Sequence, residues 1–258
     1  MNRLTRILLL LVSTILAAKA GEPLRLFAYN IKHGQGMDGK IDLERIARVI
    51  ARENPDLVAL QEVDKNCKRS GSVDQAAVLG RLLKMEHRFG KFMDFQGGEY
   101  GMAVLSRLPI EATNVHKLPL GAEPRCALEI VVKSPGWPGR VSFVSIHNDW
   151  TKEEIRVKQV SALIGLLERQ KHPFVLAGDF NAVPKSTSLN LLEKDGWEML
   201  RKKRANTWSS VDPKVEIDFF FAKGFPLFSF EDKVIDEKVA SDHLPIAVEV
   251  SPKEGKKD

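Results

Sequence analysis

Short apolar runs that end in a polar residue recur along this chain. The runs LFAY, LVALQ, VSFVSI and FVLAG are followed by Asn30, Glu62, His147 and Asp179, respectively. Apolar runs of this length with polar boundaries predict buried β-strands. Sheet proteins usually build their ligand sites at the carboxyl ends of strands. The pattern therefore predicts a sheet protein whose strand ends carry its chemistry.

Amphipathic helical segments alternate with the predicted strands. Asp42 and Asp74 are predicted to cap two helices, and Pro55 to end the first of them. Thr151 and Glu154 form the pattern of a capping box that would begin a third helix. The predicted strands cover residues 24–31, 57–63, 101–106, 110–118, 125–132, 140–147, 174–177, 215–221 and 246–250, and a fourth, shorter helix covers 186–194.

The composition is that of a globular protein. With 43% hydrophobic and 28% charged residues, the chain is able to bury a core and is neither disordered nor fibrous. No internal repeat or linker divides it, so residues 21–258 are predicted to form a single domain. Two cysteines are too few for a disulfide scaffold or a structural zinc site. The sequence leaves open whether Cys67 pairs with Cys126.

The first twenty residues have the pattern of an export signal. Arg3 and Arg6 precede an apolar run over 7–16, and Ala18 and Ala20 supply small side chains where a signal peptidase reads them. A membrane span needs about 20 apolar residues, so this run is too short for an anchor. We expect cleavage after Ala20 and a periplasmic or secreted protein without stable membrane insertion.

The net charge of +5 does not indicate a general nucleic-acid-binding surface. Arg3, Arg6 and Lys19 supply three of these five charges, because residues 1–20 contain no acidic residue. The one dense basic run, from Arg201 to Arg204, is interpreted either as a phosphate-tracking loop or as a solvated loop.

Further polar residues suited to metal or phosphate lie in short motifs. Asn181 belongs to GDFN, Asp218 to VEIDFFF, and Asp242 and His243 to SDHLP. Each has a structural alternative, since Asp and Asn also favour turns. Asp218 lies among apolar residues, so it is predicted to be partly buried and to need a partner. Any one of these motifs alone would be interpreted as structural, but together, in one order, they indicate a functional site.

The ordered motifs YNI, QEV, SIH, GDFN, EIDFFF and SDHLP resemble those of the endonuclease/exonuclease/phosphatase superfamily, the DNase I-like enzymes. The resemblance runs from about Leu24 to Val250. It implies an α/β fold, a four-layered α/β/β/α sandwich of two largely antiparallel sheets flanked by helices. It also implies a metal-dependent phosphoric ester hydrolase in which activated water attacks the phosphorus in line.

The resemblance also implies roles for the motif residues. Asp218 and His243 look like a carboxylate–histidine pair, and Asp179 looks like the residue that orients or deprotonates the attacking water. His147 looks like a donor to a phosphate oxygen, and Asn181 would hold phosphate or metal. The identity of the general base is left open.

Glu62 and Asn30 are the predicted metal ligands, with Asp242 as a further ligand or a supporting contact. Mg²⁺ prefers oxygen ligands and is usually held by one or two carboxylates together with a substrate phosphate. The expected cofactor is therefore Mg²⁺, with Mn²⁺ as the alternative. The motifs contain no set of thiolates or histidines of the kind that selects zinc.

Four further residues are candidate substrate contacts. Arg125 lies near where relatives place a phosphate-contacting arginine, and a surface ion pair is the alternative. Lys32 weakens the resemblance to AP endonucleases, some of which have a carboxylate at this position. Tyr100, in a Gly-rich turn before a strand, would either lie over the site or serve packing. Asp149 would line the cleft together with Trp150, for which packing at a helix start is the alternative.

The expected function is an exported phosphoesterase acting on a phosphodiester or phosphomonoester, and the protein is expected to be a monomer. Nucleic acid, a small phosphodiester, and a sugar or inositol phosphate all fit as substrates, whereas a lipid headgroup is disfavoured because no apolar insertion is visible. A nuclease specific for DNA or RNA is one alternative. A non-catalytic binding protein on the same fold is another, but it predicts the loss of at least one of Glu62, Asp179, Asp218 and His243, and all four are present.

Overall fold

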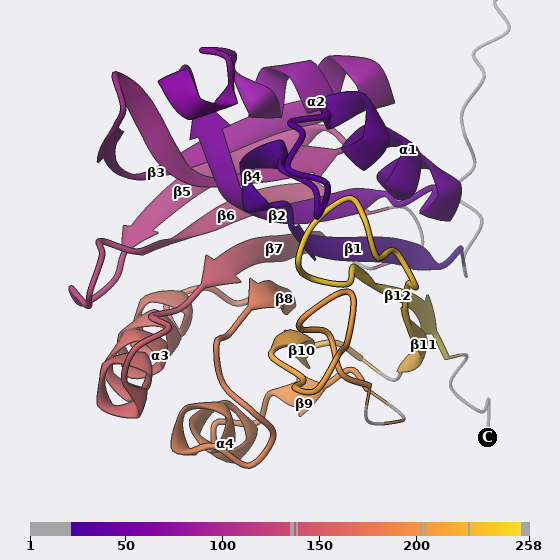
Figure 1. Cartoon of the computed structure of the whole chain (residues 1–258). Coiled ribbons are helices and arrows are strands. Elements are labelled where there is room, and N and C mark those ends of the chain that lie inside the picture. The colour runs from indigo at the N-terminus through magenta and orange to yellow at the C-terminus, as the bar shows by residue number, and fades with distance from the viewer. Residues whose placement is uncertain are drawn as a thin grey trace, which may run out of the picture.

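Two β-sheets lie face to face, and helices cover their outer faces (Figure 1). The computed structural model describes residues 22–253 except 135, 136, 138, 202, 204 and 227, so the predicted export signal lies outside the described residues. Helices α1 (Leu43–Glu53) and α2 (Gln75–Leu83) lie at the top of the view, and α3 (Glu153–Leu167) and α4 (Thr187–Lys194) at the bottom. The predicted four-layered α/β/β/α sandwich is confirmed.

Each sheet has six strands. The first has the order β11 (Phe228–Val234), β12 (Ile246–Pro252), β1 (Leu24–Asn30), β2 (Leu57–Lys65), β4 (Gly98–Ser106), β3 (Glu86–Phe95). The second has the order β5 (Ile110–Lys117), β6 (Cys126–Lys133), β7 (Arg140–His147), β8 (Phe174–Asp179), β10 (Asp218–Lys223), β9 (Glu198–Met199). Only the pairs β1–β2 and β7–β8 are parallel among these strands, so both sheets are largely antiparallel, as predicted.

Strand β1 explains why the sheets stack and why helices cover them. Leu24, Leu26 and Ala28 belong to the core between the sheets, whereas Phe27 and Tyr29 belong to the core under α1 and α2. Successive side chains of a strand point to opposite faces, so an uninterrupted apolar run needs cover on both sides. A third core, on the outer face of the second sheet, packs against α3 and α4.

Two of the predicted helix caps are confirmed. The side chain of Asp42 accepts a hydrogen bond from the backbone N–H of Arg45 at 2.8 Å, and that of Asp74 accepts one from Ala77 at 3.0 Å. Each carboxylate satisfies a backbone donor that the first helical turn leaves free. These caps fix where α1 and α2 begin.

The capping box predicted at Thr151 is wrong. Helix α3 begins at Glu153 after Lys152, whose side chain makes no capping hydrogen bond. The backbone N–H of Thr151 instead donates to Oδ1 of Asp149 at 2.8 Å. Asp149 organises the turn ahead of the helix, and this local hydrogen bonding displaces the expected cap.

Three strands, β3, β9 and β11, were not predicted, and β10 begins at Asp218 rather than at 215. Strands β3 and β11 lie at sheet edges and carry many polar residues, while β9 has only two residues. Exposure alternates strictly along β11, and its sequence, FSFEDKV, follows this period of two except at Asp232. Tyr100 lies within β4 rather than in a turn before it.

Cys67 and Cys126 are both buried, free thiols, which answers the question of their pairing for this structure. The Sγ atom of Cys67 lies 3.2 Å from the carbonyl oxygen of Glu99 as a hydrogen-bond donor. Within the described residues, no helix is long and apolar enough to cross a membrane.

Candidate functional site

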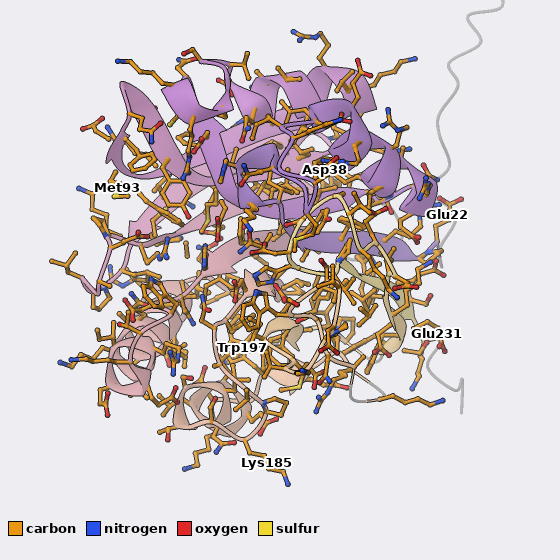
Figure 2. All side chains as sticks on the ribbon, in the orientation of Figure 1. Glu22, Asp38, Met93, Lys185, Trp197 and Glu231 are labelled. Carbon is orange, nitrogen blue, oxygen red and sulfur yellow. The ribbon has the colours of Figure 1, made fainter. Side chains whose placement is uncertain are left out.

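A cleft of about 580 Å³ opens where the strand ends of the two sheets meet. Its β3 side is marked by Met93, which Figure 2 labels at the left of the view. Most of the residues predicted from the sequence line it, namely Glu62, Tyr100, Arg125, His147, Asp179, Asn181, Asp242 and His243. Asp218 and Asn30 contact these residues from behind.

Asp179 lies at the centre of a cluster, with Asp218 and His147 placed beside it by strand register and His243 by the segment before β12. Asp179 is the last residue of β8, and it pairs with Asp218 of β10 on one side and with His147 of β7 on the other. Its Oδ2 atom lies 3.5 Å from Nε2 of His147 and 3.7 Å from Nε2 of His243. Nδ1 of His243 in turn lies 3.0 Å from Oδ2 of Asp218.

Glu62 reaches this cluster because the strand bulges. The register of β2 against β4 shifts between Gln61 and Val63, and Glu62 has a positive φ of 56°. A bulge redirects a side chain, and a non-glycine residue in this region is strained and points to a functional constraint. Nδ2 of Asn30 donates both to Oε1 of Glu62 at 3.1 Å and to Oδ2 of Asp179 at 3.2 Å.

Gly178 allows the two sheets to approach directly beneath Asp179. It has a φ of +136°, and a Cβ there would collide with the carbonyl oxygen of Ile146 and the amide nitrogen of Gln61. Gln61 belongs to the other sheet and donates to Oγ of Ser145 at 3.0 Å. The glycine of GDFN is therefore required by close packing between the sheets.

The SDH segment is held against the end of β1. Oγ of Ser241 donates to the carbonyl oxygen of Asn30 at 2.7 Å, and the N–H of Ser210 donates to that of Asp242 at 2.7 Å. These bonds join the segment before β12 to the first strand and to the loop before β10. They place His243 between Asp179 and Asp218.

Burial and like charge raise the pKa of Asp179 to about 7. Burial is the larger cause, and the charge of Asp218 adds to it, while His243 and the hydrogen bonds from Asn181 and Asn30 act in the opposite direction. A carboxyl group with a pKa near neutrality is able to exchange a proton during a reaction at neutral pH.

The two histidines have pKa values shifted in opposite directions. Burial alone would lower the pKa of His243, but Asp218, followed by Asp179 and Asp242, raises it to about 10. Burial, together with the charges of Arg125 and His243, holds the pKa of His147 well below its usual value. Near pH 7, His243 is an imidazolium donor and His147 is neutral.

Two groups of side chains offer donors for a cation. Ligand atoms of Asp179, Asp218 and His243 lie within 4.8 Å of one another. The charged His243, with Nδ1 against Asp218, has no free lone pair for a metal, so this group fits acid–base chemistry better. Glu62 and Asn30, next to Asp179, present oxygen donors, and burial raises the pKa of Glu62. A buried and a half-buried carboxylate that share one amide donor fit a hard divalent cation.

Several predicted site residues form hydrogen bonds or ion pairs with neighbouring residues of the protein. Lys32 does not line the cleft, and its Nζ lies 3.1 Å from Oδ2 of Asp242, which does. Asp149 is buried behind the cleft and accepts from the N–H of Ala122 at 2.7 Å. Asn181 donates its N–H to Oδ1 of Asp179 at 2.8 Å and its Nδ2 to the carbonyl oxygen of Asn148 at 3.1 Å.

Arg125 is a buried cation in the wall of the cleft. Only 4% of it is exposed, and its guanidinium carbon lies 4.8 Å from the ring centroid of Phe92. Its Nη2 atom pairs with Glu123 at 3.1 Å. The basic run at 201–204 does not line this cleft in its described part, and Arg201 pairs with Glu216.

Sequence reasoning missed several residues of the cleft wall. Arg69 and Phe95 come from the region of β2 to β3, and Trp208, Val215 and Ile217 from the segment before β10. No motif marks Arg69, which lies in the short 3-10 helix Lys68–Ser70 after β2. Trp208 is 44% exposed. Trp150, which the sequence had offered as a cleft residue, does line the cleft and is 63% exposed on the same rim.

A paired-sheet sandwich with buried carboxylates and histidines at its strand ends defines the DNase I-like class of proteins. The chain belongs to the endonuclease/exonuclease/phosphatase family, whose model matches residues 27–243. The six ordered motifs had indicated this family, and the match confirms it. Members of the family are typically hydrolases that act on phosphoesters.

Solved structures share the fold across most of the chain. An endonuclease/exonuclease/phosphatase from Beutenbergia cavernae is 25% identical, with 89% of this chain and 71% of that chain covered and a TM-score of 0.74. A mannosyl-6-phosphatase from Bacteroides thetaiotaomicron is 17% identical, with 88% and 99% covered and a TM-score of 0.73. Truncated TDP2 from Caenorhabditis elegans is 18% identical, with 88% and 97% covered and a TM-score of 0.67. The comparison with curated protein sequences found no match.

Proposed function

We propose that this protein is a divalent-metal-dependent phosphoesterase in which water attacks the phosphorus in line and no covalent enzyme intermediate forms. The observation that carries the proposal is the convergence of Asp179, Asp218, His243 and His147, from three strands and one loop, in a single cleft. Family membership supports hydrolysis of a phosphoester, and a mannosyl-6-phosphatase shares the fold.

Asp179 is proposed to orient the attacking water and to accept its proton. The Asn181 N–H holds Oδ1 at 2.8 Å, which leaves Oδ2 directed toward the two histidines. The pKa of about 7 suits a base that must accept a proton in the reaction and release it afterwards.

His243 is proposed to donate to a phosphoryl oxygen. Asp218 fixes the ring through Nδ1, so Nε2 points toward Asp179 and the cleft. A charged donor aimed at developing negative charge lowers the barrier, because the donor is already oriented before the reaction. Neutral His147 is proposed as a second donor through Nε2.

Glu62 and Asn30 are proposed to hold the metal ion, with Asp242 beside them. When bound, Mg²⁺ or Mn²⁺ would polarise a phosphoryl oxygen and offset negative charge in the transition state. Lys32 competes for Asp242 through their 3.1 Å ion pair, which favours Glu62 as the main carboxylate ligand.

The test is a substrate panel with purified residues 21–258. Plasmid DNA, RNA, bis-p-nitrophenyl phosphate, sugar phosphates, inositol phosphates and sphingomyelin are each incubated with Mg²⁺ or Mn²⁺, with and without EDTA. Asp179→Asn should abolish turnover, whereas Asp236→Asn, an equal charge change on an exposed loop residue, should not. In labelled water, the isotope should enter the product phosphate.

The outcomes separate the candidate functions. No turnover of any substrate would favour a binding protein on this fold, and activity that survives EDTA and Asp179→Asn would refute the assigned site. Turnover of nucleic acids alone would establish the nuclease alternative. One observation favours that alternative, namely the exposed rings of Trp150 and Trp208 at the cleft rim, because aromatic side chains stack on unpaired bases.

A further inference from the structure

Arg69 is held in a fixed orientation in the wall of the cleft that Asp179 also lines. Its Nε and Nη2 atoms donate to the two oxygens of Asp64, each at 2.8 Å. Asp64 is completely buried, so this two-point contact fixes the plane of the guanidinium group. The guanidinium carbon also lies 4.5 Å from the ring centroid of Phe95 and 5.1 Å from that of Tyr100.

This arrangement leaves the Nη1 edge of the Arg69 guanidinium group for a ligand. Asp64 uses Nε and Nη2, and Nη1 makes no hydrogen bond to any residue in the part of the chain that the structure describes. Arg69 lines the cleft together with Phe95 and Tyr100. An oriented guanidinium group loses little side-chain freedom when it binds an anion.

Arg125 lies in the wall of the same cleft with unpaired donors. It is 4% exposed, and its Nε and Nη1 atoms have no hydrogen-bond partner within the described residues. Its Nη2 pairs with Glu123 at the surface. Buried donors are normally paired, so this guanidinium group is an unexplained feature that points to a missing acceptor.

Both arginines lie near Tyr100 in the wall of the cleft. Asp64, which holds Arg69, follows Glu62 along β2 beyond the bulge and pairs with Tyr100 of β4. The guanidinium group of Arg69 lies over the ring of Tyr100, and the charge of Arg125 acts on both Tyr100 and Glu62. The two cationic groups therefore face the same cleft as the phosphoryl site, from the side of Tyr100.

We propose that Arg69 and Arg125 form a second anion subsite, which binds a second phosphate group of the substrate. This inference rests on the proposed phosphoesterase function and names its substrate class. The preferred substrate carries a further phosphate besides the scissile ester, as in a nucleic-acid strand or a sugar bisphosphate.

The test uses substrate pairs that differ only in the second phosphate. The diester pair is thymidine 5′-(p-nitrophenyl phosphate) with and without a 3′-phosphate, in which water attacks phosphorus and p-nitrophenolate leaves. The monoester pair is fructose 1,6-bisphosphate and fructose 6-phosphate, compared by hydrolysis of the C6 ester that both carry, in which water attacks phosphorus and the C6 hydroxyl leaves. In the pair that is hydrolysed, the member with the second phosphate should have a kcat/KM about tenfold higher, mainly through a lower KM.

Variants then assign that preference to the arginines. Arg69→Gln should reduce the ratio of the two kcat/KM values to about one, whereas Arg81→Gln, an exposed arginine of α2, should keep the wild-type ratio. Arg69→Gln leaves the buried carboxylate of Asp64 without its ion-pair partner. The double variant Asp64→Asn/Arg69→Gln therefore tests the loss of the Arg69 cation without leaving an unpaired buried carboxylate. Arg125→Gln should lower the ratio as well.

Each outcome bears on one proposal. Equal kcat/KM values within the hydrolysed pair, or a preference that survives Arg69→Gln in folded protein, would refute the subsite. If neither pair is hydrolysed, the phosphoesterase proposal fails for these substrates, and calorimetry decides on the subsite separately. In Mg²⁺, fructose 1,6-bisphosphate should then bind wild type about tenfold more tightly than fructose 6-phosphate does, and equal binding would refute the subsite.

Discussion

Nδ1 of His243 lies 3.0 Å from Oδ2 of Asp218, and both side chains are almost completely buried. Asp218 begins β10 in one sheet, while His243 lies in the segment that enters β12 in the other. The pair therefore joins the two sheets at the cleft. It also keeps the imidazole charged at neutral pH, since Asp218 counteracts the effect of burial and raises the pKa of His243 to about 10.

Asp218→Asn should lower the pKa of His243 and slow catalysis. Without the carboxylate, burial favours the neutral imidazole, and the donor to the phosphoryl oxygen loses its charge. We expect kcat to fall by about 10²- to 10⁴-fold with a smaller change in KM. Titration of the His243 resonances by NMR, alongside steady-state kinetics, checks both effects. An unchanged His243 titration in the folded variant would contradict the assigned pair.

Glu62→Gln should remove most of the stabilisation by metal. A ligand that binds only the folded state at about 100 times its Kd stabilises it by about 2.7 kcal/mol, which raises Tm by roughly 5–10 °C in a protein of this size. Wild type should show such a rise with Mg²⁺ or Mn²⁺ and lose it with EDTA, and Glu62→Gln should show less than a third of it. Glu154→Gln, on the exposed face of α3, is the matched control and should respond like wild type. An equal rise in Glu62→Gln would exclude Glu62 as the main ligand.

Glu129 should make the protein sensitive to acid. This buried carboxylate of β6 lies 2.7 Å from Nε2 of His116 and accepts from Nδ2 of Asn114 at 3.0 Å and Nε2 of Gln170 at 2.9 Å, with Ser142 as a further donor. Burial alone would raise its pKa, but these donors lower it to about 2. Because the folded pKa lies below the unfolded one, the carboxylate stabilises the fold fully above about pH 4.5. That contribution, about 3 kcal/mol, is lost as the pH falls toward 2.

Urea unfolding between pH 7 and pH 3 checks this contribution. Glu129→Gln should be less stable than wild type at pH 7, and the difference should shrink below pH 4.5. Glu154→Gln should follow the wild-type pH dependence. Parallel curves for wild type and Glu129→Gln would show that Glu129 does not titrate with a lowered pKa.

The N-terminal segment is proposed to be removed during export. Intact-mass analysis of the exported protein should give a chain that begins at Gly21. Ala18→Arg combined with Ala20→Arg should block processing, because both changes replace the small side chains that signal peptidase requires. An exported wild-type protein that retains Met1 would contradict this.

The residues of the site could be predicted from the sequence because buried strands have a local sequence pattern. Asn30, Glu62, His147 and Asp179 each follow a short apolar run, and such a run leaves few alternatives to a buried strand. The caps at Asp42 and Asp74 were also predictable, because an N-cap depends on atoms only three residues away. The edge strand β11 was missed because Asp232 interrupts the alternation of apolar residues in its sequence, FSFEDKV, although side-chain exposure alternates along it.

Tertiary structure alone decided which side chains meet and in which charge state. Register across β8 and β10 sets Asp179 opposite Asp218, and this contact, together with burial, raises the pKa of Asp179. The bulge at Glu62 and the position of Arg69 between Asp64 and two rings likewise depend on partners that local sequence does not name. The sequence determines which side chains are available and, through local interactions, where strands and helix caps form. Pairing, burial and electrostatic coupling arise only when distant segments pack, because each depends on distances in the folded state.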